Sequence, residues 1–181
     1  MRDRYPIILV IVFILSRLFW YGQGVRFDGY ADVDIIQLLP AEAMKENLWE
    51  AIWYSHMQPP LYSLMMHMTG WDGFLVHLLW VALGLTASLV AYSLCSGLGL
   101  GATGSFLVVG AWCLLPSTIL FENIPTYDYP TACLLILAAW ALTKKHLLTF
   151  AVTLMVVVMF RSLFHPVWML VSMLIATRRE V

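Results

Sequence analysis

The stretch from Leu147 to Ala176 reads LLTFAVTLMVVVMFRSLFHPVWMLVSMLIA, an apolar run that Arg161, Ser162 and His165 interrupt near its middle. As one helix it would be about 45 Å long, whereas the hydrocarbon core of a bilayer is about 30 Å thick. We therefore expect two short spans joined by a polar hairpin at residues 161–166. This division determines how many helices the fold has and on which side its loops emerge.

The composition of the whole chain places it in a membrane. Of its 181 residues, 61% belong to the apolar set and 12% are charged, whereas a soluble domain has about 45–50% and about 25%. A net charge of −1 and the lack of a basic stripe exclude a nucleic-acid partner. Cys95, Cys113 and Cys133 lack metal-ligand spacing, so we interpret them as small core residues.

Further apolar segments precede residues 147–176 in the chain. The first one continues past Arg17 without a signal-peptide cleavage site, so it is expected to be a retained helix. The predicted fold is an all-α membrane module over residues 1–181, with about six transmembrane helices. We expect these spans at residues 5–21, 74–94, 103–120, 129–142 and, on the two sides of the hairpin, within 147–176.

Six spans place the basic pairs of the chain on one side of the membrane. These are Arg2 and Arg4, Lys144 and Lys145, and Arg178 and Arg179. The positive-inside rule then predicts that both termini are cytoplasmic. The outer loops are accordingly residues 22–73, 121–129 and 161–166.

The first outer loop is expected to contain two interfacial helices. Residues 40–53 form an amphipathic pattern, with Met44, Leu48 and Ile52 spaced by four. Residues 59–68 are too short to span the membrane. Within Ser55-His56-Met57-Gln58-Pro59-Pro60-Leu61-Tyr62 the prolines suit the first turn of a helix, which holds His56 and Gln58 at its mouth. Asp72 is expected to cap the next helix, and residues 97–101 to form a glycine-rich turn.

The three outer loops bring polar residues to one face, and such a cluster at membrane depth indicates a functional site. The chemistry that it suggests is a carboxylate base beside an arginine that holds a leaving phosphate. The residues concerned are Arg26, Asp28, Asp32, Asp34, His56, Gln58, Glu122, Asn123, Asp128, Arg161 and His165.

Several polar residues also have simpler explanations. Asp28 precedes Gly29 and suits a turn, and Asp128 suits a helix N-terminus. Arg17 is expected to extend to the outer interface, with a cavity-lining position as the alternative. Other polar residues are expected to be solvated or structural: Asp32, Asp34, His67 and His77.

Three motifs in order resemble a known superfamily. His56-Met57-Gln58-Pro59-Pro60-Leu61-Tyr62, then Phe121-Glu122-Asn123 with residues 127–130, then Arg161-Ser162-Leu163-Phe164-His165 are similar to polyprenyl-phosphate-dependent glycosyltransferases of the GT-C superfamily. Protein O-mannosyltransferases, the lipid A aminoarabinose transferase and family-39-like transferases are members. Because members have more helices, the resemblance implies the N-terminal part of the fold, completed by further sequence or by a partner chain.

The resemblance also implies an activity and roles. The reaction would move a sugar from a polyprenyl-phosphate donor to an acceptor hydroxyl on the outer face of the membrane. Asp28 matches the catalytic aspartate, with Asp32 or Asp34 as alternatives, and Glu122 matches the acidic residue of the second loop. Arg161 matches the arginine that meets the lipid phosphate.

The rest of the predicted site binds substrate. We expect His56 to join Arg161 at the donor phosphate, and Gln58, Asn123 and His165 to complete the binding residues. Glu122 is expected to support either the acceptor or a divalent metal ion, and no other cofactor is predicted. Two other functions stay open as well. One is a non-catalytic protein or fragment that binds lipid-linked phosphate, and the other is a small transporter or flippase, for which we find no internal repeat.

Overall fold

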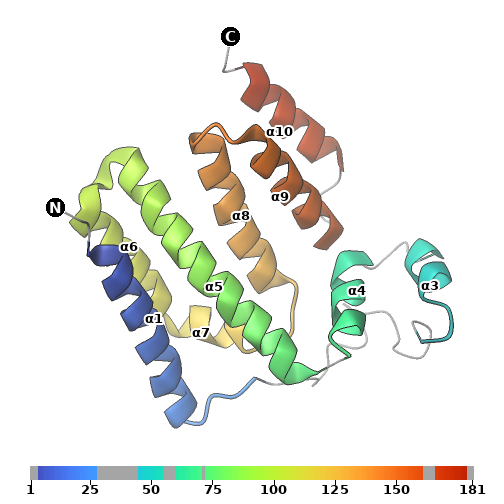
Figure 1. Ribbon diagram of the computed structural model, residues 1–181, viewed down its shortest axis with the longest axis horizontal. Helices are drawn as coiled ribbons and strands as arrows, with labels where there is room; N and C mark the ends of the chain where they lie inside the picture. The colour runs from blue at the N-terminus through green and yellow to red at the C-terminus, as the bar shows by residue number, and fades with distance from the viewer. Residues whose placement is uncertain (1–3, 28–44, 55–59, 71, 161–165, 179–181) are drawn as a thin grey trace.

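The computed structural model describes residues 4–27, 45–54, 60–70, 72–160 and 166–178, and within these ranges the chain is helical without strands (Figure 1). The α-helices are α1 (Tyr5–Gly22), α3 (Leu48–Tyr54), α4 (Pro60–Met68), α5 (Gly73–Cys95), α6 (Gly101–Leu114), α7 (Pro116–Glu122), α8 (Asp128–Thr143), α9 (Leu147–Phe160) and α10 (Pro166–Arg178); a π-helical turn, Ser96–Leu100, joins α5 to α6. The predicted all-α class is confirmed.

The long helices run alternately up and down (Figure 1). Helix α5 lies at the centre and packs against α1 and α6 on one side and against α8 on the other, while α9 packs on α8 and α10 on α9. Two ends result. The Glu122 end contains the last turn of α1, the first turns of α5 and α8, and α7. The Lys144 end contains the first turn of α1, the π-helical turn, and the last turn of α8.

Among the described residues, two helical stretches are long and apolar enough to cross a membrane: Tyr5–Gly22 and Gly73–Leu114. The second is a hairpin that reverses at Gly99 and Gly101, whose φ angles of 95° and 69° favour glycine. The glycine-rich turn is thus confirmed. Asp128–Thr143 and Leu147–Phe160 are apolar but shorter; a helix of 16 residues is about 24 Å long, less than a core of about 30 Å. The described residues therefore contain two stretches of sufficient length, and the six predicted spans are not all shown.

The predicted helix over residues 103–120 is wrong in one respect, because the structure divides it. Leu115 is extended (φ −60°, ψ 129°) and precedes Pro116, which begins α7. The proline ring disfavours helical backbone at the residue before it, so the break follows from the sequence. Helix α7 then continues to Glu122. The loop predicted over residues 121–129 consequently begins at Asn123, and Glu122 belongs to a helix.

The first outer loop is described in part. Helix α3 covers the second half of the predicted interfacial helix, and residues 40–44 lie outside the described ranges. Helix α4 begins at Pro60, as predicted. Asp72 accepts hydrogen bonds from the backbone N–H groups of Phe74 (2.8 Å) and Leu75 (3.4 Å), which confirms the predicted N-cap.

The main core lies between α4, α5, α8 and α9, and its largest members are aromatic: Tyr62, Trp80, Tyr129 and Phe160. Tyr62 is fully buried and donates its hydroxyl to the carbonyl oxygen of Pro125, which ties α4 to the loop before α8. Cys113 and Cys133 are buried core residues, as predicted, whereas Cys95 is half-buried.

Candidate functional site

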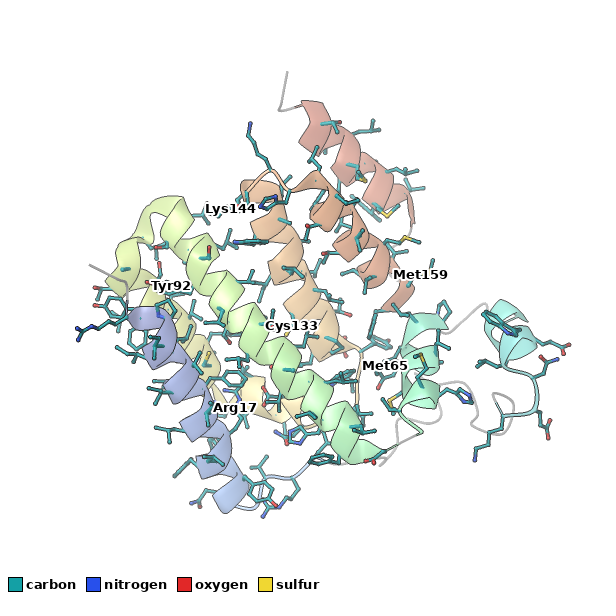
Figure 2. All side chains as sticks on the ribbon, viewed as in Figure 1. Arg17, Met65, Tyr92, Cys133, Lys144 and Met159 are labelled. Carbon is teal, nitrogen blue, oxygen red and sulfur yellow. The ribbon has the colours of Figure 1, made fainter. Side chains whose placement is uncertain are left out.

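A buried ion pair joins α1 to α7. Arg17 Nη2 lies 2.6 Å from Glu122 Oε2, and Arg17 Nε lies 3.0 Å from Glu122 Oε1, so the guanidinium contacts both carboxylate oxygens. Glu122 is 0% exposed and Arg17 13%. The Phe13 ring covers the other side of the guanidinium, 3.6 Å from its Cζ. Figure 2 shows Arg17 pointing from α1 into the helix bundle.

Further hydrogen bonds satisfy both partners of this pair. Arg17 Nη1 donates to Ser16 Oγ and to the carbonyl oxygen of Cys113, both at 2.9 Å. The Tyr129 hydroxyl donates to Glu122 Oε2 at 2.7 Å. A buried charge is tolerated when it is paired and its remaining hydrogen-bonding groups are satisfied. The network formed by Arg17, Glu122 and Tyr129, which we call the Glu122 network, therefore holds α1, α6, α7 and α8 together.

Gly84 on α5 makes room for the Glu122 network. A Cβ atom at this position would lie 2.0 Å from the Tyr129 hydroxyl oxygen and 3.1 Å from Glu122 Oε2. A contact of 2.0 Å is far inside van der Waals distance. The absence of a side chain at Gly84 thus lets the central helix approach the buried charges.

A cavity of about 150 Å³ lies beside the Glu122 network, between α1, α5 and α7. Apolar and aromatic side chains form most of its wall, and three polar side chains join them. Its lining residues are Arg17, Leu18, Trp20, Tyr21, Val25, His77, Val81, Ile119 and Asn123. An apolar wall with few polar groups is typical of small-molecule sites, whereas the volume of this cavity lies below their usual range of about 300–1,000 Å³.

The residues just before Asp28 contact the wall of this cavity. The Phe27 ring stacks on His77 at 5.1 Å between ring centroids. The Arg26 guanidinium lies 3.5 Å from the centroid of the Tyr21 ring and donates to the carbonyl oxygen of Tyr21. His77 Nε2 is buried and has no hydrogen-bond partner within the described part of the chain. The described backbone therefore reaches the cavity one residue before Asp28.

Four of the eleven polar residues predicted at this face fall within the described ranges: Arg26, Glu122, Asn123 and Asp128. Glu122 belongs to the buried network, and Asn123, 7% exposed, lines the cavity and donates from Nδ2 to the carbonyl oxygen of Ile119 at 2.8 Å. The other predicted site residues lie outside the described residues: Asp28, His56, Gln58, Arg161 and His165, together with the alternatives Asp32 and Asp34.

The prediction that Arg17 extends to the outer interface is wrong, and its alternative, a cavity-lining position, is correct. Arg17 turns inward because the buried Glu122 carboxylate needs a countercharge. Sequence reasoning also missed Tyr129 and Gly84 as members of the site. The sequence did carry a signal for the ion pair: Arg17 lies five residues before the end of the apolar α1, where a charge requires a partner.

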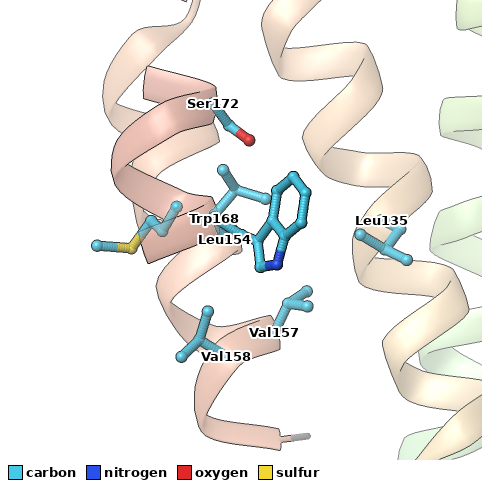
Figure 3. A pocket seen from close by; sticks show the side chains of 7 residues that line it. Leu135, Leu154, Val157, Val158, Trp168 and Ser172 are labelled. Atoms are coloured by element: carbon cyan, nitrogen blue, oxygen red, sulfur yellow. The ribbon is translucent and has the colours of Figure 1, made fainter. Parts of the chain in front are cut away.

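A second pocket, of about 420 Å³, lies between α8, α9 and α10. Figure 3 shows the Trp168 indole turned toward Leu135 across this pocket. Leu154, Val157, Val158 and Met169 complete the apolar wall, and Ser172 is its one hydroxyl. Among the described residues, no titratable side chain lines this pocket.

The described residues contain no group of three or more histidine, cysteine, aspartate or glutamate side chains that could hold a metal ion. No family model, curated protein or solved structure matches this chain. The site is interpreted from its own chemistry. Glu122 Oε1 and Oε2 accept hydrogen bonds from Arg17, and Oε2 also accepts one from Tyr129, so these bonds fix the orientation of the carboxylate.

Proposed function

We propose that this protein is a GT-C-type glycosyltransferase of the bacterial inner membrane, which moves a sugar from a polyprenyl-phosphate donor to an acceptor hydroxyl. The Glu122 end is the outer face, and the shorter apolar helices complete the six spans. The observation that carries the proposal is the cavity beside the Glu122 network, at which Phe27 fixes the chain next to Asp28.

In this proposal Asp28 is the base that accepts the proton of the acceptor hydroxyl. Arg161 and His56 contact the donor phosphate, and Gln58 and His165 complete the binding residues. Asn123 supports the proposal because it lines the cavity. Glu122 acts as a positioning residue, since its hydrogen bonds to Arg17 and Tyr129 fix the wall of the cavity.

Transfer by the purified full chain in liposomes tests this function. The donors are polyprenyl phosphates that carry radiolabelled mannose, glucose or aminoarabinose, and the measured quantity is label released from the lipid. We expect Asp28→Asn to abolish transfer while the thermal unfolding midpoint stays unchanged. Asp72→Asn is the matched control, because it makes the same chemical change at a helix cap and should keep full activity. Retained transfer in Asp28→Asn would remove Asp28 from its role.

A second candidate function is lipid-phosphate binding without turnover. It is favoured by the complete pairing of Glu122, the one carboxylate described at the cavity side. Photo-crosslinking with a polyprenyl-phosphate analogue distinguishes the two. Crosslinking together with transfer supports the glycosyltransferase, and crosslinking without transfer for any donor supports the binding protein. Movement of the analogue between bilayer leaflets would instead support a flippase.

A further inference from the structure

A groove at the Lys144 end has no place in the proposed reaction. Its volume is about 650 Å³, and it lies where α1 begins, α5 passes into the π-helical turn, and α8 ends. Its lining residues are Pro6, Leu89, Tyr92, Ser93, Ser96, Gly97 and Lys144. The volume is within the range of about 300–1,000 Å³ that ligand sites occupy.

The charges at this end are all basic among the described side chains: Arg4, Lys144 and Lys145. The described carboxylates belong to other places, namely Glu46 and Glu50 beside or in α3, and Asp72, Glu122 and Asp128 at the Glu122 end. Arg17 and Glu122 form the ion pair of the described residues, so Lys144 has no carboxylate partner among them. Figure 2 shows Lys144 at the end of α8, remote from Arg17.

We propose that this groove binds the phosphate headgroup of an anionic phospholipid. Lys144 supplies the positive charge, and the Ser96 hydroxyl supplies a hydrogen-bond donor. Ser93 Oγ accepts a hydrogen bond from Trp140 Nε1 at 3.2 Å and keeps its own proton for a phosphate oxygen. Pro6 and Leu89 provide apolar contact for the glycerol and the first acyl carbons.

The membrane setting supplies the ligand. The proposal rests on the membrane insertion put forward above, with the Lys144 end at the cytoplasmic leaflet, and does not rest on glycosyl transfer. Anionic lipids are concentrated in that leaflet, and basic pockets between helices on this side bind phosphate headgroups. Lys144 also lies at the C-terminal end of α8, where a positive charge complements the helix dipole in any protein. The experiment must therefore separate lipid binding from this structural effect.

Native mass spectrometry of the full chain in detergent measures the lipid affinity. The probes are dioleoyl-phosphatidylglycerol and dioleoyl-phosphatidylcholine. We expect phosphatidylglycerol to bind more tightly than phosphatidylcholine. Lys144→Gln should weaken phosphatidylglycerol binding about fivefold and leave phosphatidylcholine binding unchanged. Lys145→Gln is the matched control, because it removes the same charge from the next residue, which does not line the groove. It should weaken binding less than twofold.

A second variant tests the groove without changing charge. A Cβ atom at Gly97 would meet no atom within 4 Å, so Gly97→Leu adds a side chain at the groove without a clash at its Cβ. We expect it to lower phosphatidylglycerol binding and to leave the thermal unfolding midpoint unchanged. Inorganic phosphate at equal concentration should not displace the lipid.

Three results would overturn the proposal: equal binding of the two lipids, equal effects of the two lysine variants, or displacement of the lipid by inorganic phosphate. Glycosyl transfer is measured separately with the liposome assay. Loss of lipid selectivity with intact glycosyl transfer would overturn only the lipid-binding proposal. Intact lipid selectivity without glycosyl transfer would overturn only the proposed function.

Discussion

The two ends of the helix bundle differ in how their charged side chains are buried and paired. At the Glu122 end, a fully buried carboxylate contacts a guanidinium at 2.6 Å, and a tyrosine hydroxyl adds a third group. At the Lys144 end, basic side chains are exposed, and no described carboxylate lies near them. The side chains of the ion pair are buried at the Glu122 end, whereas the basic side chains are exposed at the Lys144 end.

This difference has a simple physical basis. A charge without water needs a partner, because the cost of removing it from water is several kcal/mol. A charge in water needs none, and an exposed ion pair contributes only about 0–1 kcal/mol. The Glu122 end is thus expected to determine stability, and the Lys144 end to remain free for binding. The predictions below test that division.

The largest expected effect is the loss of Glu122. Glu122→Ala leaves Arg17 buried without its carboxylate and should lower the free energy of unfolding by about 3–5 kcal/mol. Unfolding in mixed micelles measures this change. The double variant Arg17→Met with Glu122→Leu replaces the pair by apolar side chains and should be more stable than Glu122→Ala. A double variant as unstable as the single one would show that the pair does not act as a unit.

The second largest loss of stability is expected from a substitution of Gly84. Gly84→Ala places a Cβ atom 2.0 Å from the Tyr129 hydroxyl and should cost about 1–3 kcal/mol in the same unfolding experiment. Gly110→Ala is the matched control, because Gly110 is also a buried helical glycine but its Cβ would meet no atom within 4 Å. It should be neutral, or more stable by up to ~1 kcal/mol. Equal costs for the two glycines would contradict the close approach.

The helix cap at Asp72 should matter less. Asp72→Ala removes the acceptor for the N–H groups of Phe74 and Leu75, and the expected loss is about 1 kcal/mol. Asp72→Asn keeps a side-chain oxygen at the cap and should stay close to the wild-type stability. A large loss in the asparagine variant would mean that the charge of Asp72, and not its hydrogen bonds, stabilises α5.

The smallest effect is expected at the Lys144 end. Lys144→Gln should change the free energy of unfolding by no more than about 0.5 kcal/mol, because an exposed charge without a partner contributes little. The same measurement on Lys145→Gln provides the comparison. A loss of more than about 1 kcal/mol in Lys144→Gln would break the contrast between the two ends, since it would assign a structural partner to Lys144.

Local sequence signals predicted much of the fold. The start of α4 at Pro60, the cap at Asp72 and the reversal at Gly99 each depend on the conformational preferences of one or two residues. Pro116 carried the same kind of signal, and giving it full weight would have ended α6 at Leu114. That error placed Glu122 in a loop.

The candidate site could be predicted only in part. Glu122 and Asn123 were selected as polar residues after an apolar helix, and both belong to the site region. The position of Arg17 was assigned from its own helix alone, so its partner was missed. Tyr129 falls within residues 127–130 of the second motif, but the motif assigns it no role. Gly84 carries no signal, because a glycine is an ordinary residue in an apolar helix.

The sequence by itself determined the helical class, the apolar stretches long enough to cross a membrane, and the basic residues that gather at the Lys144 end. These properties follow from composition, spacing and local backbone preference. Only the tertiary structure decided that Arg17 meets Glu122, a residue 105 positions away, and that Gly84 leaves room for the Tyr129 hydroxyl beside Glu122. Such contacts depend on distances of a few ångströms between packed helices, and packing, not spacing along the chain, sets those distances.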